Sequence, residues 1–311
     1  MLSSGWRSGA SVSCAECKLI SRRAYLASLT GVVVTACKLC PQTSKPADGK
    51  AEPQDWVCPM HPDYRASAPG VCPRCGMRLV LGIPERIELP LEVTHEPPVL
   101  RPRQNVTLRL RVLQPDGRAV ERHFEIVHEK LMHVFLVSES LEYFAHLHPT
   151  LQADGWFELP VCLPEGGMYR LLADFYPSGS APQLAAATFF VSGKGLPPHL
   201  ASALAPYQAT NLSAALQLEP EQPLAGLETR LHFTLDPGVG LERYLGAWAH
   251  MLVASGDLID LIHIHPFLTD EKQHMQFNLI FPRPGFYRVW TQFQRLGIVN
   301  TTRFTISVRS L

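Results

Sequence analysis

Polar and apolar residues alternate along much of the chain after residue 85, and this alternation predicts β-strands. The segments TLRLRV (107–112) and RLHFTL (230–235) switch between polar and apolar side chains at every position. A period of two is typical of a strand that buries one face. The apolar runs VFLVS (134–138) and MLVAS (251–255) have the length of further strands. Only residues 198–206 show a possible helical period, so the sequence predicts a mainly β protein.

The chain after residue 85 contains the same unit twice. Residues 133–149 align with residues 250–266 without a gap. Turn signals such as Pro-Asp-Gly and Pro-Glu-Gly-Gly separate the strands. A repeat of this length indicates a duplicated domain and not a short-period solenoid. We therefore expect two tandem antiparallel β-sandwiches of the immunoglobulin or cupredoxin type, over residues 85–194 and 195–311.

Three histidines recur at identical spacing in both copies. They are His133, His146 and His148 in the first copy and His250, His263 and His265 in the second. Alternate side chains of a strand point to the same side, so both histidines of each His-x-His-Pro motif share the outer face, opposite the apolar core. The first histidine of each triad begins an apolar run that suits the neighbouring strand, where its imidazole can meet the other two. Three imidazoles with an open position form metal sites for zinc and copper. The alternative is that duplication has copied histidines with a purely structural role.

The surroundings of the two triads differ. His128 and Met132 precede His133, whereas Leu245 and Ala249 stand at the equivalent positions of the second copy. Imidazole and thioether groups are both metal ligands. We therefore expect the first triad to be the better metal site.

Two other side chains in the repeats have their own predicted roles. Asp174 can supply a carboxylate ligand or hold a ligating histidine in place, whereas its counterpart Gln292 cannot ionise. Cys162 stands in the apolar run ELPVCLP, which predicts a buried and inert thiol.

A separate cysteine-rich segment precedes the repeats. Two ligand pairs, Cys58-x-x-His61 and Cys72-x-x-Cys75, can hold one ion from two tight turns in a closed tetrahedral site. A segment this short cannot bury a sufficient core, so a bound metal would supply much of its folding free energy. The thioethers of Met60 and Met77 favour copper(I), whereas the spacing alone suits zinc.

This segment, over residues 55–82, resembles the heavy-metal-binding module of copper efflux adaptor proteins and heavy-metal-pumping ATPases. The matching residues are Cys58-Pro59-Met60-His61-Pro62, Pro69-Gly70, Cys72-Pro73, Cys75-Gly76-Met77 and Leu79, with Trp56 in place of the usual Tyr. The resemblance implies a heavy-metal ion as ligand and an efflux system as a possible partner. Two alternatives remain at this stage. One is a zinc knuckle that only holds its own loop together, and the other is a disulfide, which would leave one of three cysteines unpaired.

The N-terminal region predicts export and attachment to a membrane. Ser21-Arg22-Arg23-Ala24-Tyr25-Leu26 precedes an apolar run and resembles a twin-arginine signal. Val34-Thr35-Ala36-Cys37 resembles a lipobox, which implies that Cys37 carries the lipid and that residues 1–37, including Cys14 and Cys17, are the signal. The polar, Pro-rich residues 38–54 suit a flexible linker. We expect a periplasmic or cell-surface protein that is anchored to the membrane by its lipid.

Composition and missing motifs narrow the function further. Hydrophobic residues make up 46% and charged residues 18% of the 311 residues, which excludes a disordered chain. Lys plus Arg and Asp plus Glu both number 28, so the basic excess of a nucleic-acid-binding protein is absent. The sequence contains no Gly-x-Ser-x-Gly, His-Glu-x-x-His or phosphate-loop motif, and we expect no enzymatic activity.

Three function classes remain after these exclusions. The sequence favours a tethered protein that binds copper or another heavy metal for capture, storage or handover to efflux. The second class is an exported scaffold or adhesion protein that is stabilised by zinc. The third is an enzyme with a three-histidine metal centre, which would also require a general base beside the histidines.

Overall fold

All regular elements in the described part of the chain are β-strands. The structure is a computed structural model that describes residues 56–58, 64–73, 78–81, 88–120, 123–178, 182–270 and 274–311. The predicted mainly β class, with tandem antiparallel sandwiches, is confirmed. The possible helix at 198–206 is wrong: this segment is irregular and contains an isolated bridge from Ala203 to Thr305.

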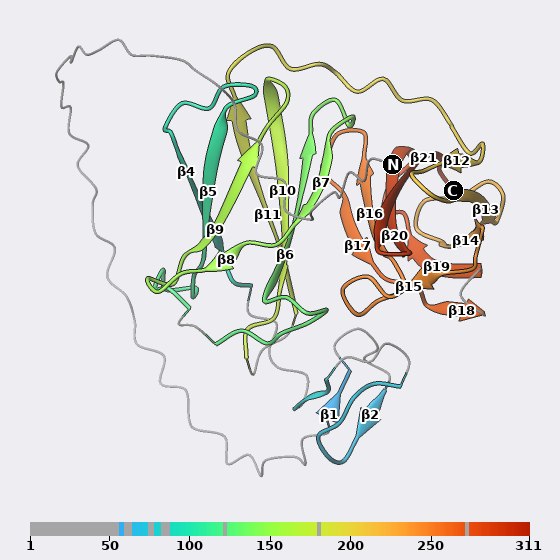
Figure 1. Ribbon diagram of the computed structural model, residues 1–311, viewed down its shortest axis with the longest axis horizontal. Helices are drawn as coiled ribbons and strands as arrows, with labels where there is room; N and C mark the ends of the chain where they lie inside the picture. Colours follow the sequence, from blue (N-terminus) through green and yellow to red (C-terminus); the bar gives the residue numbers. More distant parts are fainter. Residues whose placement is uncertain are drawn as a thin grey trace, which may run out of the picture. The chain divides into compact units, whose positions relative to one another are not determined.

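The first sandwich consists of two four-stranded antiparallel sheets (Figure 1). One sheet has the order β4-β5-β9-β8 and the other has the order β11-β10-β6-β7. The strands are β4 (Leu91–Glu96), β5 (Asn105–Val112), β6 (Met132–Ser138), β7 (Phe144–Leu147), β8 (Thr150–Leu151), β9 (Phe157–Cys162), β10 (Gly167–Phe175) and β11 (Gln183–Val191). Inward-facing apolar residues such as Leu108, Phe157 and Tyr169 fill the core between the sheets.

The second sandwich repeats the strand order of the first and adds one short strand to each sheet. One sheet has the order β12-β13-β14-β19-β18, and in the other β20 pairs with β21, β16 and β15, while β17 pairs with β16. The strands are β12 (Tyr207–Gln208), β13 (Ser213–Glu219), β14 (Glu228–Asp236), β15 (Leu241–Glu242), β16 (His250–Ser255), β17 (Leu261–Ile264), β18 (Leu268–Asp270), β19 (His274–Ile280), β20 (Gly285–Arg295) and β21 (Ile298–Val308). Its core contains Phe233, Phe277 and Phe304.

The strands that carry the histidines are buried on both faces. Every residue of β6 and every residue of β16 is buried. On β6, Met132 and Val134 face the core of the first sandwich, whereas Phe135 belongs to a separate cluster with residues of the second sandwich. The outer face of this sheet is therefore covered by protein, which explains why the strand is apolar without alternation.

The cysteine module contains a small three-stranded sheet of order β2-β1-β3. Its strands are β1 (Trp56–Val57), β2 (Arg65–Ala66) and β3 (Val80–Leu81). Cys58, Cys72 and Leu79 are buried together in its centre. Two cysteines in a core this small are consistent with a fold that is organised around sulfur.

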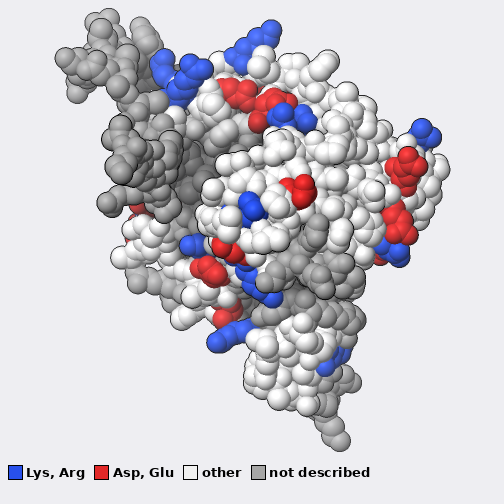
Figure 2. Space-filling model, turned by 45° about the vertical axis from the view of Figure 1, so that its right-hand side comes forward, with Lys and Arg blue, Asp and Glu red and all other residues white. Residues whose placement is uncertain are grey.

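The predicted signal, the lipid-bearing Cys37 and the linker at 38–54 lie outside the described residues. The described part of the chain contains no helix that is long and apolar enough to cross a membrane. Figure 2 shows Lys and Arg side chains interspersed with Asp and Glu on one face. Several charged side chains of the described residues are paired, such as Arg283 with Asp257 and Arg109 with Asp154.

Candidate metal centre

The two sandwiches meet through the outer faces of the sheets that carry the histidines. An apolar cluster contains Phe135, Val137, Leu141 and Leu172 from the first sandwich and Leu252, Ala254, Leu258 and Trp290 from the second. The rings of Phe144 and Trp290 stack at 5.0 Å between centroids. Glu142 accepts hydrogen bonds from Arg288 and Arg303 at this interface. The contact is largely apolar, and equivalent positions of the two copies belong to the same cluster.

Each histidine triad gathers its nitrogens in a small volume at this interface. In each triad, the candidate ligand nitrogens all lie within 4.8 Å of one another. His133 Nδ1 is 3.0 Å from His146 Nε2 and 3.2 Å from His148 Nε2. In the second triad, His250 Nδ1 is 3.0 Å from His265 Nε2. The structure thus brings together the three residues that the spacing predicts in each copy.

A tight turn orients the first histidine of each triad. His133 donates a hydrogen bond from Nε2 to the carbonyl oxygen of Val127 at 3.1 Å, and His250 does so to that of Tyr244 at 2.9 Å. These bonds place the proton of each neutral imidazole on Nε2 and leave a lone pair on Nδ1. Both turns contain left-handed residues, including His128 (φ 49°) and Leu245 (φ 50°). Such conformations are costly for residues other than glycine, so the same strained turn in both copies suits a functional role.

Each sandwich orients the second histidine of the other triad. His146 donates from Nδ1 to Oε1 of Gln292, across the interface, at 2.8 Å. Gln292 is itself fixed by donating from Nε2 to Oγ1 of Thr301. In the reciprocal contact, His263 donates from Nδ1 to Oδ2 of Asp174 at 2.7 Å. Both histidines therefore direct the lone pair of Nε2 away from these partners, and hydrogen bonds of this kind orient metal-ligating histidines.

The protonation pattern leaves nitrogen lone pairs facing each other. With their protons on the opposite ring nitrogens, His133 Nδ1 and His146 Nε2 face each other at 3.0 Å without a proton between them. His263 Nε2 is buried and has no hydrogen-bond partner. A buried nitrogen without a partner is unfavourable, so both sites are suited to a cation that accepts these lone pairs.

Burial keeps these imidazoles in the neutral form that binds metals. Loss of hydration lowers the pKa of His133 to about 4 and the pKa of His148 to about 3. Burial and the neighbouring histidines hold the pKa of His146, His250 and His265 well below the ordinary value. A metal ion therefore needs to displace no proton from these side chains near neutral pH.

The two triads belong to one cluster of rings. The centroids of His133 and His250 are 5.7 Å apart, and those of His146 and His250 are 5.2 Å apart. The sequence predicts three-histidine sites and their outer-face position, but not that the two sites are neighbours. The only sequence signal for this arrangement is the uninterrupted apolar run that follows the first histidine of each triad, on β6 and on β16.

The expected advantage of the first triad does not follow from the structure. Met132 points into the core of its own sandwich, because it lies on the opposite face of β6 from His133. The ring of His128 is 6.3 Å from that of His133 but only 4.1 Å from that of His265, so it lies beside the second triad. Burial lowers the pKa of His128 to about 4, and its Nε2 has no hydrogen-bond partner.

Asp174 contacts a triad histidine, as predicted, but this histidine belongs to the other copy. It pairs in register with His133 in its own sheet, but its carboxylate contacts His263 of the other copy. The residue therefore supports the second triad and not the first. Sequence alone could not assign this partner, because the contact depends on how the two sandwiches dock.

Only part of the cysteine site lies in the described residues. Cys58 and Cys72 are both buried with an exposed fraction of 0%. The backbone N–H of Cys58 donates to the carbonyl oxygen of Tyr64 at 3.0 Å, and that of Leu79 donates to the carbonyl oxygen of Gly70 at 2.9 Å. The predicted ligands His61 and Cys75, and the thioethers of Met60 and Met77, lie outside the described residues.

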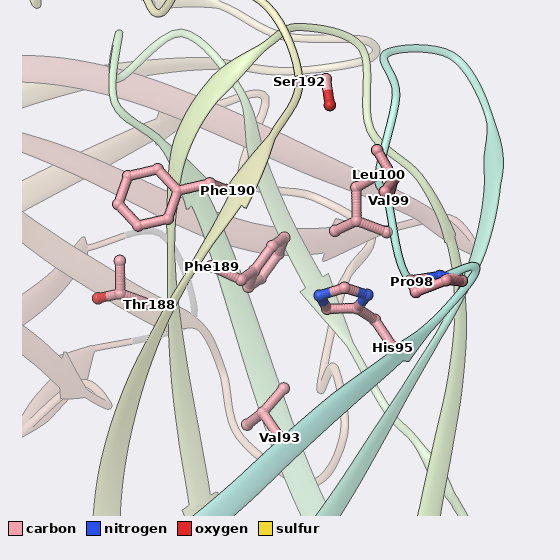
Figure 3. A pocket seen from close by; sticks show the side chains of 9 residues that line it. All are labelled: Val93, His95, Pro98, Val99, Leu100, Thr188, Phe189, Phe190 and Ser192. Atoms are coloured by element: carbon pink, nitrogen blue, oxygen red, sulfur yellow. The ribbon is translucent and has the colours of Figure 1, made fainter. Parts of the chain in front are cut away.

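Other candidate groups stand apart from the histidine cluster. Cys162 is half-buried at the end of β9, so the prediction of a buried thiol is wrong. A pocket of about 400 Å³ lies between β4 and β11, where His95 and Phe189 contribute to its lining (Figure 3). His95 contacts the carbonyl oxygen of Pro97 at 3.0 Å and is the only titratable side chain among the labelled lining residues. This pocket lacks the converging polar groups of a catalytic site.

Two protein-family models match this chain, one over the two sandwiches and one over the cysteine module. The model of a domain of unknown function (DUF8832) matches residues 88–193 and 209–310, which contain the two sandwiches. The model of a heavy metal binding domain matches residues 56–80. The resemblance of the cysteine module is thus confirmed, and the chain carries a heavy-metal-binding domain.

Curated relatives match over the same short stretch. A silver exporting P-type ATPase of Salmonella typhimurium is 47% identical over 38 residues, and a copper-exporting P-type ATPase of Legionella pneumophila is 49% identical over 39 residues. Each match covers 12% of this chain and 5% of the ATPase, so the chain spans about a twentieth of these relatives.

Two solved structures show a distant likeness to this chain. The Escherichia coli adhesin FdeC is 12% identical with a TM-score of 0.24, over 75% of this chain and 69% of that chain. The fibronectin(III)-like modules of Clostridium thermocellum CbhA are 10% identical with a TM-score of 0.20, over 70% of this chain and 95% of that chain.

Proposed function

This chain belongs to the family of the domain of unknown function DUF8832, and we propose that it is a tethered heavy-metal carrier that captures copper through its cysteine module. The module would take up the ion outside the cytoplasm, and the chain would store it or pass it to an efflux system. The proposal concerns binding and transfer, and it assigns no reaction to the chain.

The heavy-metal-binding domain over residues 56–80 is the observation that carries this proposal. Cys58 and Cys72 lie in the buried centre of the module, where each would supply one sulfur ligand, and His61 and Cys75 stand at ligand spacing from them in the sequence. Thiolates and thioethers favour copper(I). The names of the two matched ATPases, which export silver and copper, support the same class of ion.

Tethering and export rest on the N-terminal sequence. The Ser21-Arg22-Arg23 segment supports export, and Cys37 is the proposed lipid attachment site. The Pro-rich residues 38–54 would let the module reach partners at some distance from the membrane. An efflux pump that presents thiolate or thioether ligands could then accept the ion by ligand exchange.

The first prediction concerns the cysteine module. The full chain is titrated with copper(I), and separately with zinc(II), in competition with a chromophoric chelator. Cys72→Ser is expected to lower the copper content by one ion per chain, because it removes one of the thiolates that would complete the site. Cys162→Ser is the matched control and should leave the copper content unchanged.

Two results would contradict the carrier. In one, the parent chain binds zinc tightly in the module and leaves copper(I) with the chelator, which would indicate the zinc-stabilised scaffold. In the other, Cys72→Ser binds as much copper as the parent, which would exclude the module as the capture site.

A further inference from the structure

We propose that the six histidines of the two triads form one two-cation centre, buried between the sandwiches, which binds two copper(I) ions. One ion would be held by His133 Nδ1, His146 Nε2 and His148 Nε2, and the other by His250 Nδ1, His263 Nε2 and His265 Nε2. This site is separate from the cysteine module, and it stands whether or not the module captures copper.

Converging lone pairs are the first argument. Carbonyl oxygens of two turns fix the protons of His133 and His250 on Nε2. Gln292 and Asp174 fix the protons of His146 and His263 on Nδ1. The remaining nitrogens of these four rings thus carry lone pairs in the interior, where water is scarce. His148 and His265 can each donate from Nε2 to only one of these lone pairs, on His133 Nδ1 and His250 Nδ1. A metal ion can instead accept the lone pairs of all three rings of a triad at one point.

The unpartnered nitrogen of His263 is the second, independent argument. Its side chain is only 2% exposed, and its Nε2 has no hydrogen-bond partner. A buried nitrogen without a partner is unfavourable, and a metal ligand on Nε2 of His263 would remove this cost while Asp174 holds the ring in place. The arrangement of carboxylate, histidine and cation is common in metal sites.

The two triads form one centre because their rings are neighbours and each triad depends on the opposite sandwich. The rings of His133 and His250 belong to different triads, yet their centroids are 5.7 Å apart. Because a cation lies about 2 Å from its ligand nitrogen, the two ions would be on the order of 10 Å apart or closer. Each triad also requires the opposite sandwich to orient one of its ligands, so neither site is complete in a single copy.

Charge favours monovalent ions at full occupancy. The repulsion between two divalent ions is four times that between two monovalent ions at the same distance. Asp174 is the carboxylate that contacts a triad histidine, and the nearby Lys130 adds positive charge beside His133 and His148. Imidazole is a suitable ligand for copper, and two copper(I) ions need the least compensating charge. A divalent ion is expected to bind singly, in the triad that Asp174 supports.

The test uses the full chain in which serine replaces the three module cysteines and the four N-terminal cysteines, so that neither group can bind copper(I). The replaced residues are Cys14, Cys17, Cys37, Cys40, Cys58, Cys72 and Cys75. This parent is titrated anaerobically with copper(I) against a chromophoric chelator. It is expected to retain two ions per chain. His146→Gln with His148→Gln, or His263→Gln with His265→Gln, should each leave one ion, and the combined variant should leave none. His95→Gln is the matched control and should retain two.

The number of copper ions bound by each variant distinguishes the two-cation centre from its absence. The two-cation centre is supported if the parent binds two copper ions, each double variant binds one, and the combined variant binds none. A parent that retains fewer than two ions overturns it, and so does a triad variant that retains as many ions as its parent. Far-UV circular dichroism identifies any variant that fails to fold, and single His146→Gln and His263→Gln substitutions then replace the double variants. Since no module cysteine is present, failure here leaves the proposed capture site untouched.

A parallel titration with zinc(II) tests the charge argument. One tightly bound zinc ion per chain is expected, and it should be lost with His263→Gln but kept with His146→Gln. Two zinc ions bound with equal affinity would overturn the preference for monovalent ions.

Discussion

Which nitrogen of a histidine carries its proton is decided here by a neighbour. Val127 and Tyr244 offer carbonyl oxygens, whereas Gln292 offers an amide oxygen and Asp174 a carboxylate. The carbonyl acceptor is the same chemical group in both copies. The side-chain acceptor differs, because a carboxylate carries a negative charge and an amide does not. The triads are therefore equal in ligands and unequal in the basicity that their surroundings confer.

The charge difference between Asp174 and Gln292 gives a prediction at the residue scale. Asp174→Asn keeps the shape but removes the negative charge behind His263, so it should weaken zinc(II) binding at the second triad by about 10–100-fold. Gln292→Glu adds a charge behind His146 and should strengthen the first triad. Both affinities are measured by competition titration in the chain that lacks the module cysteines.

A second substitution at Asp174 distinguishes loss of its support for His263 from general damage to the fold. Asp174→Glu restores the charge and should recover part of the affinity that Asp174→Asn loses, with unchanged circular dichroism. Equal zinc affinity in the parent and Asp174→Asn would show that this carboxylate does not support a ligand.

At the scale of elements, β6 and β16 each pack against protein on both faces. One face of each strand packs in the core of its own sandwich, and the other packs against the opposite sandwich. The apolar part of this interface holds the imidazole rings in place, since Phe135 stacks on His146 at 4.3 Å between centroids. The position of the ligands therefore depends on residues that bind no metal.

Trp290 allows this dependence to be measured. It is 2% exposed and stacks on Phe144 across the interface. Trp290→Ala should lower the free energy of unfolding by about 3–5 kcal/mol, because it removes a large buried side chain and leaves a cavity. It should also weaken copper(I) retention in the chain without module cysteines. Chemical denaturation and the chelator assay measure the two effects.

The control for this substitution is an exposed aromatic residue on a strand. Phe190 is 68% exposed, so Phe190→Ala should change the free energy of unfolding by no more than about 0.5 kcal/mol. If Trp290→Ala were as mild as this control, the interface would not hold the sandwiches together.

The sequence predicts most of the strands because their signal is local. Period-two alternation identifies β5 and β14, and the repeated His-x-His-Pro motif identifies β7 and β17. Each triad is also predictable, since two of its residues lie on adjacent strands of one sheet and the third follows the end of one of them. The partners Asp174 and Gln292 are not, because they act across a docking surface whose geometry depends on many weak contacts.

On the scale of the whole molecule, duplication produced an interface between like surfaces. Phe135 and Leu252 are equivalent positions in the two copies, and so are Leu141 and Leu258, and each pair lies in the shared cluster. Such a contact resembles the self-complementary interface of a symmetric dimer, here within a single chain. It doubles the metal capacity of one triad and lets the copies diverge at Asp174 and Gln292. The cysteine module adds a third proposed site of different chemistry.

Anomalous X-ray scattering from crystals of the copper-loaded full chain tests the central claim most directly. Data collected at the copper absorption edge should show two anomalous peaks within the histidine cluster, one about 2 Å from the three ligand nitrogens of each triad, and a third in the cysteine module. Copper found elsewhere, or a histidine cluster without anomalous signal at saturating copper(I), would contradict the account.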